Sequence, residues 1–289
     1  MAKNQKTSHL NVSYLYSSVF KFNPVLDDLG FGSDAIVIDL EDGVHDSAKE
    51  QARQKIASLD ISDITRKDLM IGVRINQVFS IEGIRDLAAV YSAVKAGSLA
   101  IDFLKIPKVR TYHDVLLCKK LFDKLPIEIK MIPIIEVPEA IDNIDQIAAL
   151  SDAMMFGQVD MAATMYHLNK SYMDYARGKF CIACAQKEIA AIDTAAIRHD
   201  MDLKDMRAFE KECLASKDEG FTGKAIIHPD QVPIVNKVYS VTEQEMDGYR
   251  SVVNLYENAD IGFSIVEGKI IAPPFVARAQ MMLRLYGHR

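Results

Sequence analysis

The chain alternates short apolar runs with longer stretches whose apolar residues recur every three or four positions, and this alternation constrains the fold most. Short apolar runs are typical of β-strands, whereas the longer spacing is typical of amphipathic helices. Together they indicate units in which parallel strands are connected by helices. The runs that we interpret as strands occupy residues 12–18, 35–41, 70–76, 103–108, 131–136, 153–157, 189–194 and 224–229.

The helical patterns fall between and after these runs. Eight strands with eight crossover helices predict a (β/α)8 TIM barrel, a fold that needs about 250 residues. The chain has 289 residues, so the barrel fits with some sequence left over. A doubly wound open sheet is the alternative. The helical patterns lie near residues 20–29, 46–58, 80–96, 110–124, 138–149, 171–187, 202–218 and 230–239.

The pattern predicts one barrel domain over residues 1–240 and a C-terminal extension over residues 241–289. Within the extension we expect a helix at 243–259, a short hairpin around Glu267-Gly268 and a last helix from about Pro274. The extension is too small to fold alone. We therefore expect it to pack on the barrel or on a neighbouring subunit.

Composition and charge narrow the function classes. Hydrophobic residues make up 49% and charged residues 26% of the chain, as in an ordinary globular protein. The net charge is −6 and no long basic run occurs, so nucleic acid is not an expected partner. No stretch of about 18 apolar residues and no apolar N-terminal segment is present, so we expect no membrane partner and a cytoplasmic location.

The spacing of Cys181 and Cys184 matches a C-x-x-C motif, which occurs in redox and zinc sites. Both residues lie inside a continuous helical pattern, and no second pair of cysteines accompanies them. Free cysteine is usually a small buried residue. We therefore expect two buried thiols at this motif.

Polar side chains stand at the ends of most of the apolar strands. In a (β/α)8 barrel, the C-terminal ends of the strands and the loops after them build the active site. Charged residues at these positions are therefore candidates for chemistry. In chain order they are Asp39, Glu41, Asp42, Arg74, Lys108, Glu136, Asp160 and His228.

Glu136 and Asp160 are the candidate metal ligands. Glu136 follows the apolar segment MIPII, where an ionised carboxylate needs a cation or hydrogen bonds. Asp160 lies one strand–helix unit later, and adjacent strands lie about 4.8 Å apart, so both carboxylates can reach one ion. Such an oxygen site suits Mg²⁺ or Mn²⁺ better than zinc. The alternative is that each carboxylate only caps the helix after it.

Arg74 and Lys108 are the candidate cations of the same edge. Arg74 ends a short apolar strand, and its guanidinium is suited to bidentate binding of a substrate carboxylate. It is equally suited to an ion pair with Asp39 or Glu41, and the two roles are compatible. Lys108 either assists an anionic substrate or pairs with the acidic residues.

The order of these motifs resembles the citrate lyase beta-subunit-like branch of the HpcH/HpaI aldolase superfamily. The resemblance runs from about residue 12 to residue 280, and the shared order and spacing of the motifs carry it. The motifs are DLEDG (39–43) with Lys49 and Ala52-Arg53, RIN (74–76), IPK (106–108), PIIE (133–136), FG (156–157) with Asp160, and GFTGKAIIHPDQ (220–231).

The resemblance implies a (β/α)8 barrel, commonly in trimers or hexamers, that makes or breaks carbon–carbon bonds next to a 2-oxo acid or an acyl-CoA thioester. It implies that Glu136 and Asp160 bind Mg²⁺ and that Arg74 holds a substrate carboxylate. Glu41 and Asp42 would support water or substrate around the metal. The backbone near Gly157 would line the carboxylate pocket.

Two segments depart from the family pattern. The first strand of the family usually begins with Arg-Ser and ends with Pro-Gly, whereas residues 12–13 are Val-Ser and residues 17–19 are Ser-Ser-Val. The CoA-ester lyases also tend to carry an aspartate near the C-terminus, where Ala272 stands in this chain. A methyl group cannot transfer a proton. Both departures weaken the expectation of CoA chemistry.

We therefore predict a Mg²⁺-dependent carbon–carbon lyase or aldolase that acts on a small 2-oxo-acid or hydroxy-acid substrate, as a homo-oligomer. One alternative is a CoA-ester lyase that cleaves a citryl-, citramalyl- or malyl-CoA-like compound. The other is a barrel that has lost catalysis and binds a metal and a carboxylate. Turnover in the presence of Mg²⁺ separates the first two possibilities from the third.

Overall fold

A computed structural model describes residues 11–23, 30–61, 69–167, 169–195, 205–258, 263–266 and 269–286. The chain divides into two compact units. One unit is Asn11–Tyr239, and the other contains the C-terminal segment from Ser240.

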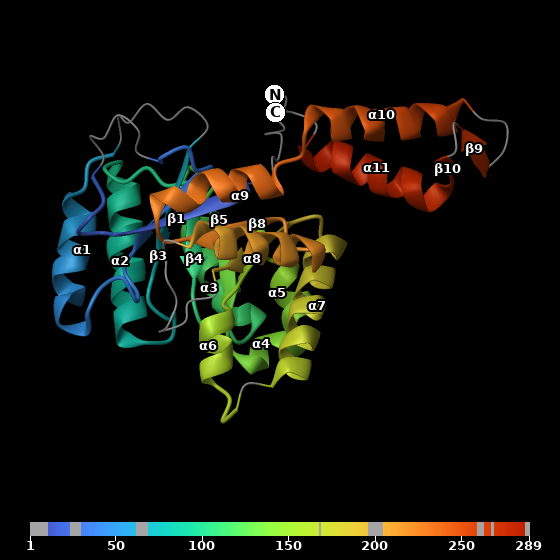
Figure 1. Cartoon of the computed structure of the whole chain (residues 1–289). Coiled ribbons are helices and arrows are strands. Elements are labelled where there is room, and N and C mark those ends of the chain that lie inside the picture. The colour runs from blue at the N-terminus through green and yellow to red at the C-terminus, as the bar shows by residue number, and fades with distance from the viewer. Residues whose placement is uncertain are drawn as a thin grey trace. The chain divides into compact units, whose positions relative to one another are not determined.

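Eight parallel strands of the first unit close into a barrel in chain order (Figure 1). β8 pairs with β1 and completes the ring. This arrangement confirms the predicted (β/α)8 fold and excludes the open sheet. The strands are β1 (Ser13–Ser18), β2 (Ala35–Asp39), β3 (Met70–Arg74), β4 (Phe103–Ile106), β5 (Lys130–Ile135), β6 (Ala153–Phe156), β7 (Ala190–Thr194) and β8 (Gly223–Ile226).

Helices follow the strands at nearly all the predicted positions. Local sequence explains the helix ends, as in α2, where Ser80 accepts a hydrogen bond from the Gly83 N–H and Gly97 ends the helix at φ 82°. The helices of this unit are η1 (Asp46–Ala48), α1 (Lys49–Ser58), α2 (Ile81–Ala96), α3 (Tyr112–Phe122), α4 (Pro138–Asp142), α5 (Ile144–Ala148), α6 (Gln158–Ala163), α7 (Lys170–Gln186), α8 (Met206–Asp218), η2 (Pro229–Gln231) and α9 (Val232–Tyr239).

Three helix predictions differ from the structure. The predicted helix at 138–149 is broken at Asn143, whose backbone leaves the helical region. The short helix α6 was not predicted, because six residues carry too little periodicity to detect. The pattern at 20–29 falls largely on residues 24–29, which lie outside the described residues, and the residues just before them form a turn.

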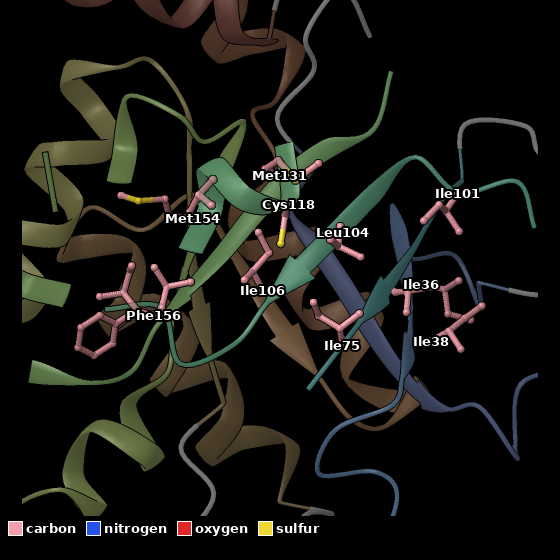
Figure 2. Packing of buried hydrophobic residues seen from close by; sticks show 14 of the residues in the cluster. Ile36, Ile38, Ile75, Ile101, Leu104, Ile106, Cys118, Met131, Met154 and Phe156 are labelled. Atoms are coloured by element: carbon pink, nitrogen blue, oxygen red, sulfur yellow. The ribbon is translucent and has the colours of Figure 1, made fainter. Parts of the chain in front are cut away.

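Two layers of apolar side chains fill the unit. Outward-facing residues of the strands, such as Ile36, Ile38, Leu104 and Phe156, pack with the helices in a continuous buried cluster (Figure 2). Alternate residues of the same strands point into the barrel. Four cysteines belong to this buried cluster, and none of them forms a disulfide. They are Cys118, Cys181, Cys184 and Cys213. The prediction of buried thiols at the C-x-x-C motif is thus confirmed.

The ring of Phe103 fills the barrel interior, and it leaves no room for a side chain at position 72. Gly72 on β3 pairs with Phe103 on β4, and a Cβ atom on Gly72 would lie only 2.0 Å from the nearest atom of the Phe103 ring. The Phe103 ring also packs edge-on against Tyr14, with 6.0 Å between the ring centroids. Glycine at position 72 therefore lets a phenylalanine fill the barrel.

The C-terminal unit consists of α10 (Glu243–Glu257), β9 (Ser264–Val266), β10 (Lys269–Ile271) and α11 (Pro273–Tyr286). β9 and β10 pair antiparallel, which confirms the predicted hairpin strands, while its tip at Glu267-Gly268 lies outside the described residues. α10 and α11 lie side by side (Figure 1). The surface against which this unit packs stays a prediction.

Among the described residues, no helix is long and apolar enough to cross a membrane.

Replacement of Gly72 by alanine tests the packing of the barrel interior. We expect Gly72→Ala to lower the free energy of unfolding by about 1–3 kcal/mol, because the Phe103 ring cannot move out of a filled interior. The matched control is Gly178→Ala in α7, where an added Cβ meets nothing within 4 Å. Urea denaturation measures both. Equal stability of the two variants would contradict this account of the interior.

Candidate active site

A cavity of about 990 Å³ opens at the C-terminal ends of the barrel strands. Its polar lining includes most of the residues that the sequence singled out. Those residues are Asp39, Asp42, Arg74, Glu136, Gly157 and Asp160. The loops after β2, β3, β5 and β6 thus bring together side chains that are far apart in the sequence, as expected at this face of a barrel.

Arg74 forms ion pairs with three acidic residues at this end of the barrel. Its Nε donates to Asp39 Oδ1 at 2.7 Å, and its Nη2 donates to Asp39 Oδ2 at 2.6 Å. The remaining nitrogen, Nη1, lies 2.9 Å from Glu41 Oε2 and 3.1 Å from Asp42 Oδ2. Asp39 therefore holds two nitrogens of the guanidinium, and Nη1 contacts the buried Glu41 and the exposed Asp42, whose side chain is 61% exposed.

Lys108 pairs with the same acidic group. Its Nζ donates to Glu41 Oε1 at 2.7 Å. Its backbone has a positive φ of 51°, which is uncommon for a residue with a side chain, and its N–H donates to Glu136 Oε1 at 2.7 Å. Lys108 thus connects two acidic residues from different strands, one through its side chain and one through its backbone.

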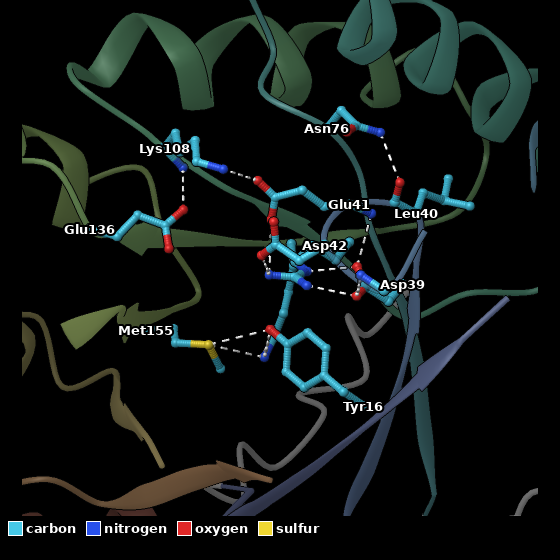
Figure 3. A network of polar contacts seen from close by, with 12 residues as sticks. Tyr16, Asp39, Leu40, Glu41, Asp42, Asn76, Lys108, Glu136 and Met155 are labelled. Atoms are coloured by element: carbon cyan, nitrogen blue, oxygen red, sulfur yellow. Dashed lines mark hydrogen bonds and ion pairs between the residues drawn. The ribbon is translucent and has the colours of Figure 1, made fainter. Parts of the chain in front are cut away.

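The loop after β2 is held from behind by buried donors. Lys49 Nζ donates to the carbonyl oxygens of Leu40 and Glu41 at 2.9 and 2.7 Å. Asn76 Nδ2 also donates to the Leu40 carbonyl at 2.9 Å (Figure 3). Both donors belong to motifs named in the sequence. Their side chains fix the backbone of the loop and leave its carboxylates directed toward the cavity.

Glu136 is held against a glycine. A Cβ atom on Gly157 would lie 2.5 Å from Glu136 Oε2 and 2.6 Å from Glu136 Cβ. The φ of Gly157 is −93°, so the backbone allows alanine there, and the side chain of Glu136 leaves no room for its Cβ. The absence of a side chain at position 157 therefore makes room for the carboxylate of Glu136.

The helix-capping alternative for the two candidate metal ligands is not supported. α4 follows Glu136, and Asp160 lies in the first turn of α6, but neither helix has a side-chain hydrogen bond at its N-cap. Within the part of the chain that the structure describes, the Asp160 carboxylate makes no hydrogen bond and no ion pair. It faces the cavity without a partner.

The cavity carries more negative than positive charge. The carboxylates of Asp39, Glu41 and Asp42 outnumber the charges of Arg74 and Lys108 before Glu136 and Asp160 are added. Burial, together with the carboxylates of Glu41 and Asp160, raises the pKa of Glu136 to about 8. Burial also raises the pKa of Glu41, although Arg74 acts against this.

The residues fit a divalent cation. Glu41 Oε2 is buried without a hydrogen-bond partner, since its contact with Arg74 lacks hydrogen-bond geometry. No cluster of three or more His, Cys, Asp or Glu side chains suited to a metal occurs among the described residues. Mg²⁺ needs no such cluster, because it usually keeps several waters and takes one or two protein carboxylates. Glu136 and Asp160 match that requirement.

Two residues of the cavity region were not singled out in the sequence. Tyr16 on β1 lines the cavity, and Lys105 on β4 lies fully buried beside it. Lys105 carried a signal, because a lysine at an inward position of an apolar strand is expensive to bury. Tyr16 carried none, since tyrosine is common in strands.

The chain belongs to the HpcH/HpaI aldolase/citrate lyase family, whose family profile matches residues 14–229. Citrate lyase subunit beta of Leuconostoc mesenteroides subsp. cremoris is 32% identical over 284 residues, which covers 91% of this chain and 89% of that protein. The resemblance found in the sequence, including its citrate lyase beta-like branch, is thus confirmed.

Other relatives carry different names. A (3S)-malyl-CoA thioesterase of Cereibacter sphaeroides is 28% identical over 263 residues and covers 88% of this chain and 87% of its own length. Among solved structures, RipC from Yersinia pestis is 29% identical, with a TM-score of 0.67, over 82% of this chain and 98% of that one.

A further solved structure supports the fold alone. CitE from Mycobacterium tuberculosis, in complex with magnesium, acetoacetate and coenzyme A, has a TM-score of 0.70 to this chain at 22% identity. The similarity covers 96% of this chain and 99% of that one.

Replacement of Gly157 by alanine tests the contact between this glycine and Glu136. We expect Gly157→Ala to displace the Glu136 carboxylate and to weaken Mg²⁺ binding by about 10-fold or more, as loss of a metal-site partner does. Calorimetric titration with Mg²⁺ measures this, with Gly178→Ala as the control of equal chemistry. Unchanged affinity in Gly157→Ala would separate this glycine from the metal site.

The raised pKa of Glu136 predicts a pH-dependent stability in metal-free protein. Between the ordinary pKa of 4.5 and about 8, the folded protein holds a proton that the unfolded chain releases, so stability falls as pH rises through this range. Glu136→Gln keeps an oxygen for the Lys108 N–H but cannot ionise. We expect this variant to raise Tm by at least ~3 °C near pH 8.5 and to change it little near pH 5, in melting curves recorded with EDTA. The same difference at both pH values would contradict the raised pKa.

Proposed function

We propose that this protein is a Mg²⁺-dependent carbon–carbon lyase or aldolase that acts on a small 2-oxo-acid or hydroxy-acid substrate. The observation that carries the proposal is the surplus of carboxylates in the cavity, where burial and neighbouring carboxylates raise the pKa of Glu136 and the Asp160 carboxylate has no partner among the described residues. Membership of the aldolase/citrate lyase family supports it. Mn²⁺ suits the same ligands.

Glu136 and Asp160 would hold the ion. When bound, the ion supplies positive charge to the keto and carboxylate oxygens of an oxo acid and to the oxyanion that develops during cleavage or condensation. The protein's own part is to keep both ligands in place. Gly157 leaves room for Glu136, and the Lys108 N–H fixes one of its oxygens, so that the other is available to the ion.

Arg74 would bind the substrate carboxylate through Nη1. Its other two donors are held by Asp39, so the guanidinium keeps a fixed orientation while it binds a ligand. Nη1 is shared with Asp42, whose exposed side chain can move away at little expense. A substrate carboxylate would then replace the Asp42 carboxylate on Arg74. This differs from bidentate binding of substrate, which would require the Asp39 pair to break.

Glu41, Asp42 and Lys108 would complete the site. Glu41 lies between Arg74 and Lys108, and its unsatisfied oxygen is available to a water on the metal. Asp42 lies at the exposed side of the cavity, where its side chain is in contact with solvent. Lys108 would neutralise Glu41 and so limit the repulsion of an anionic substrate. Gly157 would line the pocket with backbone atoms.

A CoA-ester lyase is the second candidate, and two observations favour it. Relatives are named (3S)-malyl-CoA thioesterase, and the cavity of about 990 Å³ exceeds what a small acid fills. Ala272 argues against it, because this position, directly before α11, offers no proton to a substrate. Cleavage of malyl-CoA compared with free hydroxy acids separates the two candidates.

A cytoplasmic location and a homo-oligomer, either a trimer or a hexamer, remain part of this proposal. The resemblance found in the sequence implies the oligomer, and the C-terminal unit is a candidate for contact with a neighbouring subunit. Analytical ultracentrifugation measures the oligomeric state.

The metal assignment predicts the behaviour of three amide variants. Glu136→Gln and Asp160→Asn should each weaken Mg²⁺ binding by about 10- to 100-fold and reduce Mg²⁺-dependent turnover, while the far-ultraviolet spectrum is unchanged. The matched control is Glu139→Gln, an exposed acid in the first turn of α4. Calorimetry with Mg²⁺ and an assay of oxo-acid release report the two effects.

Three outcomes would count against the proposal in different ways. Normal Mg²⁺ affinity in both Glu136→Gln and Asp160→Asn would remove these residues from the metal site. Mg²⁺ and oxaloacetate binding without turnover of any tested acid or CoA ester would favour a barrel that has lost catalysis. Efficient cleavage of malyl-CoA alone would favour the CoA-ester lyase.

A further inference from the structure

A lysine is buried inside the barrel below the acidic cavity and has no acidic partner. Lys105 on β4 has 0% of its surface exposed. The strand register places it beside Arg74, which in turn pairs with Asp39, so all three positions point into the barrel. Among the described residues, no carboxylate forms an ion pair with Lys105. Burial of an unpaired amine is expensive, so the position calls for a compensating role.

The contacts of Lys105 are two aromatic rings and one hydroxyl. Its Nζ lies 4.5 Å from the ring centroid of Tyr14 and 4.7 Å from that of Tyr16, both within the range of cation–π attraction. Nζ donates a hydrogen bond to Tyr16 Oη at 3.2 Å and lies 3.5 Å from Met155 Sδ. The Tyr16 hydroxyl is therefore a stronger acceptor for the Lys105 amine than the Met155 thioether.

The proton of the Tyr16 hydroxyl has only a weak acceptor. Because Oη accepts from Lys105, the O–H bond must point elsewhere, and among the described residues it donates to Met155 Sδ at 3.4 Å (Figure 3). A thioether is a poor acceptor compared with a carbonyl or carboxylate oxygen. Tyr16 lines the cavity, so its hydroxyl would gain by donating to an oxygen of a molecule bound there.

The surroundings of Tyr16 strengthen its hydroxyl as a donor. The Arg74 guanidinium lies over the Tyr16 ring, 4.9 Å from the centroid. A positive group over the ring and a hydrogen bond received at the oxygen both make the hydroxyl proton more positive, as in other hydrogen-bond chains. The chain of contacts runs from Lys105 through Tyr16 to the space below Arg74 and Glu136.

We propose that Tyr16 donates a hydrogen bond from its hydroxyl to an oxygen of the bound oxo acid, and that Lys105 is the positioning residue that directs this donor. The inference rests on the proposed function, because the oxo acid is the ligand of that function. It adds a binding group on the floor of the cavity, contributed by β1 and β4, to the metal and Arg74 at its rim.

Five variants test the proposal by calorimetric titration of Mg²⁺-loaded protein with oxaloacetate as the probe. Tyr16→Phe should weaken oxaloacetate binding by about 10-fold or more, because a hydrogen bond to a charged ligand is lost, and should leave Mg²⁺ affinity unchanged. Tyr14→Phe is the matched control, since it keeps the second ring against Lys105 and its hydroxyl interacts with Asn11 outside the cavity lining.

Two substitutions of Lys105 distinguish its role as a hydrogen-bond donor to Tyr16 from its role in filling space. Lys105→Met fills similar space without a donor and should weaken oxaloacetate binding about as much as Tyr16→Phe. Lys105→Gln keeps an N–H donor without charge and should restore most of the affinity. The combined Tyr16→Phe/Lys105→Met variant should bind no more weakly than Tyr16→Phe alone, because both changes remove one interaction.

The outcomes distinguish this inference from the proposed function. If the unmodified Mg²⁺-loaded protein does not bind oxaloacetate, the proposed function fails and the inference falls with it. If it binds and Tyr16→Phe binds equally well, only the inference is overturned, and the Tyr16 hydroxyl then keeps its contact with Met155 Sδ. Equal weakening by Lys105→Met and Lys105→Gln would remove Lys105 from the positioning role.

Discussion

The carboxylate of Asp39 is the contact on which the candidate site depends. It accepts hydrogen bonds from the N–H groups of Glu41 and Gly43 and from two nitrogens of Arg74. The first pair folds the loop after β2 back on the strand end, and the second pair ties this loop to β3. A carboxylate so fully satisfied stabilises the buried guanidinium at little net expense. Loss of Asp39 would therefore release the loop and Arg74 together.

The carboxylates of Glu136 and Asp160 are not satisfied by hydrogen bonds in this way. We therefore assign Asp39 a structural role and the other two a role in ligand binding. Both oxygens of Asp39 accept hydrogen bonds from the protein, whereas Glu136 has a raised pKa and Asp160 has no partner among the described residues. Groups left unsatisfied in a folded protein reduce its stability and are retained where they serve a ligand. A bound cation would remove the repulsion, so ligand binding and folding stability are expected to be linked.

The barrel and its cavity edge were predictable because both follow from local periodicity. Alternation of apolar runs and helical patterns located all eight strands, and the barrel rule then placed Glu136 and Arg74 at one edge. The sequence did not predict which donors of Arg74 bind Asp39 and which remain for a substrate, because this depends on the register of β2 and β3. The contact between Tyr16 and Lys105 was not predicted for a related reason. A hydrogen bond between β1 and β4 crosses the barrel interior, and no sequence spacing encodes it.

The interior of the barrel is polar on one side and apolar on the other, and this asymmetry orients any ligand. β1 to β4 contribute Tyr16, Asp39, Arg74 and Lys105, whereas β5, β6 and β8 contribute the apolar side chains Ile134, Met155 and Ala225 to the cavity lining. Glu136 and Gly157 lie above the apolar wall, at the rim. These side chains favour a ligand whose oxygens face β1–β4 and the rim. The bond to be broken or made would then lie against an apolar wall that excludes water, where a developing charge is stabilised most strongly by fixed donors.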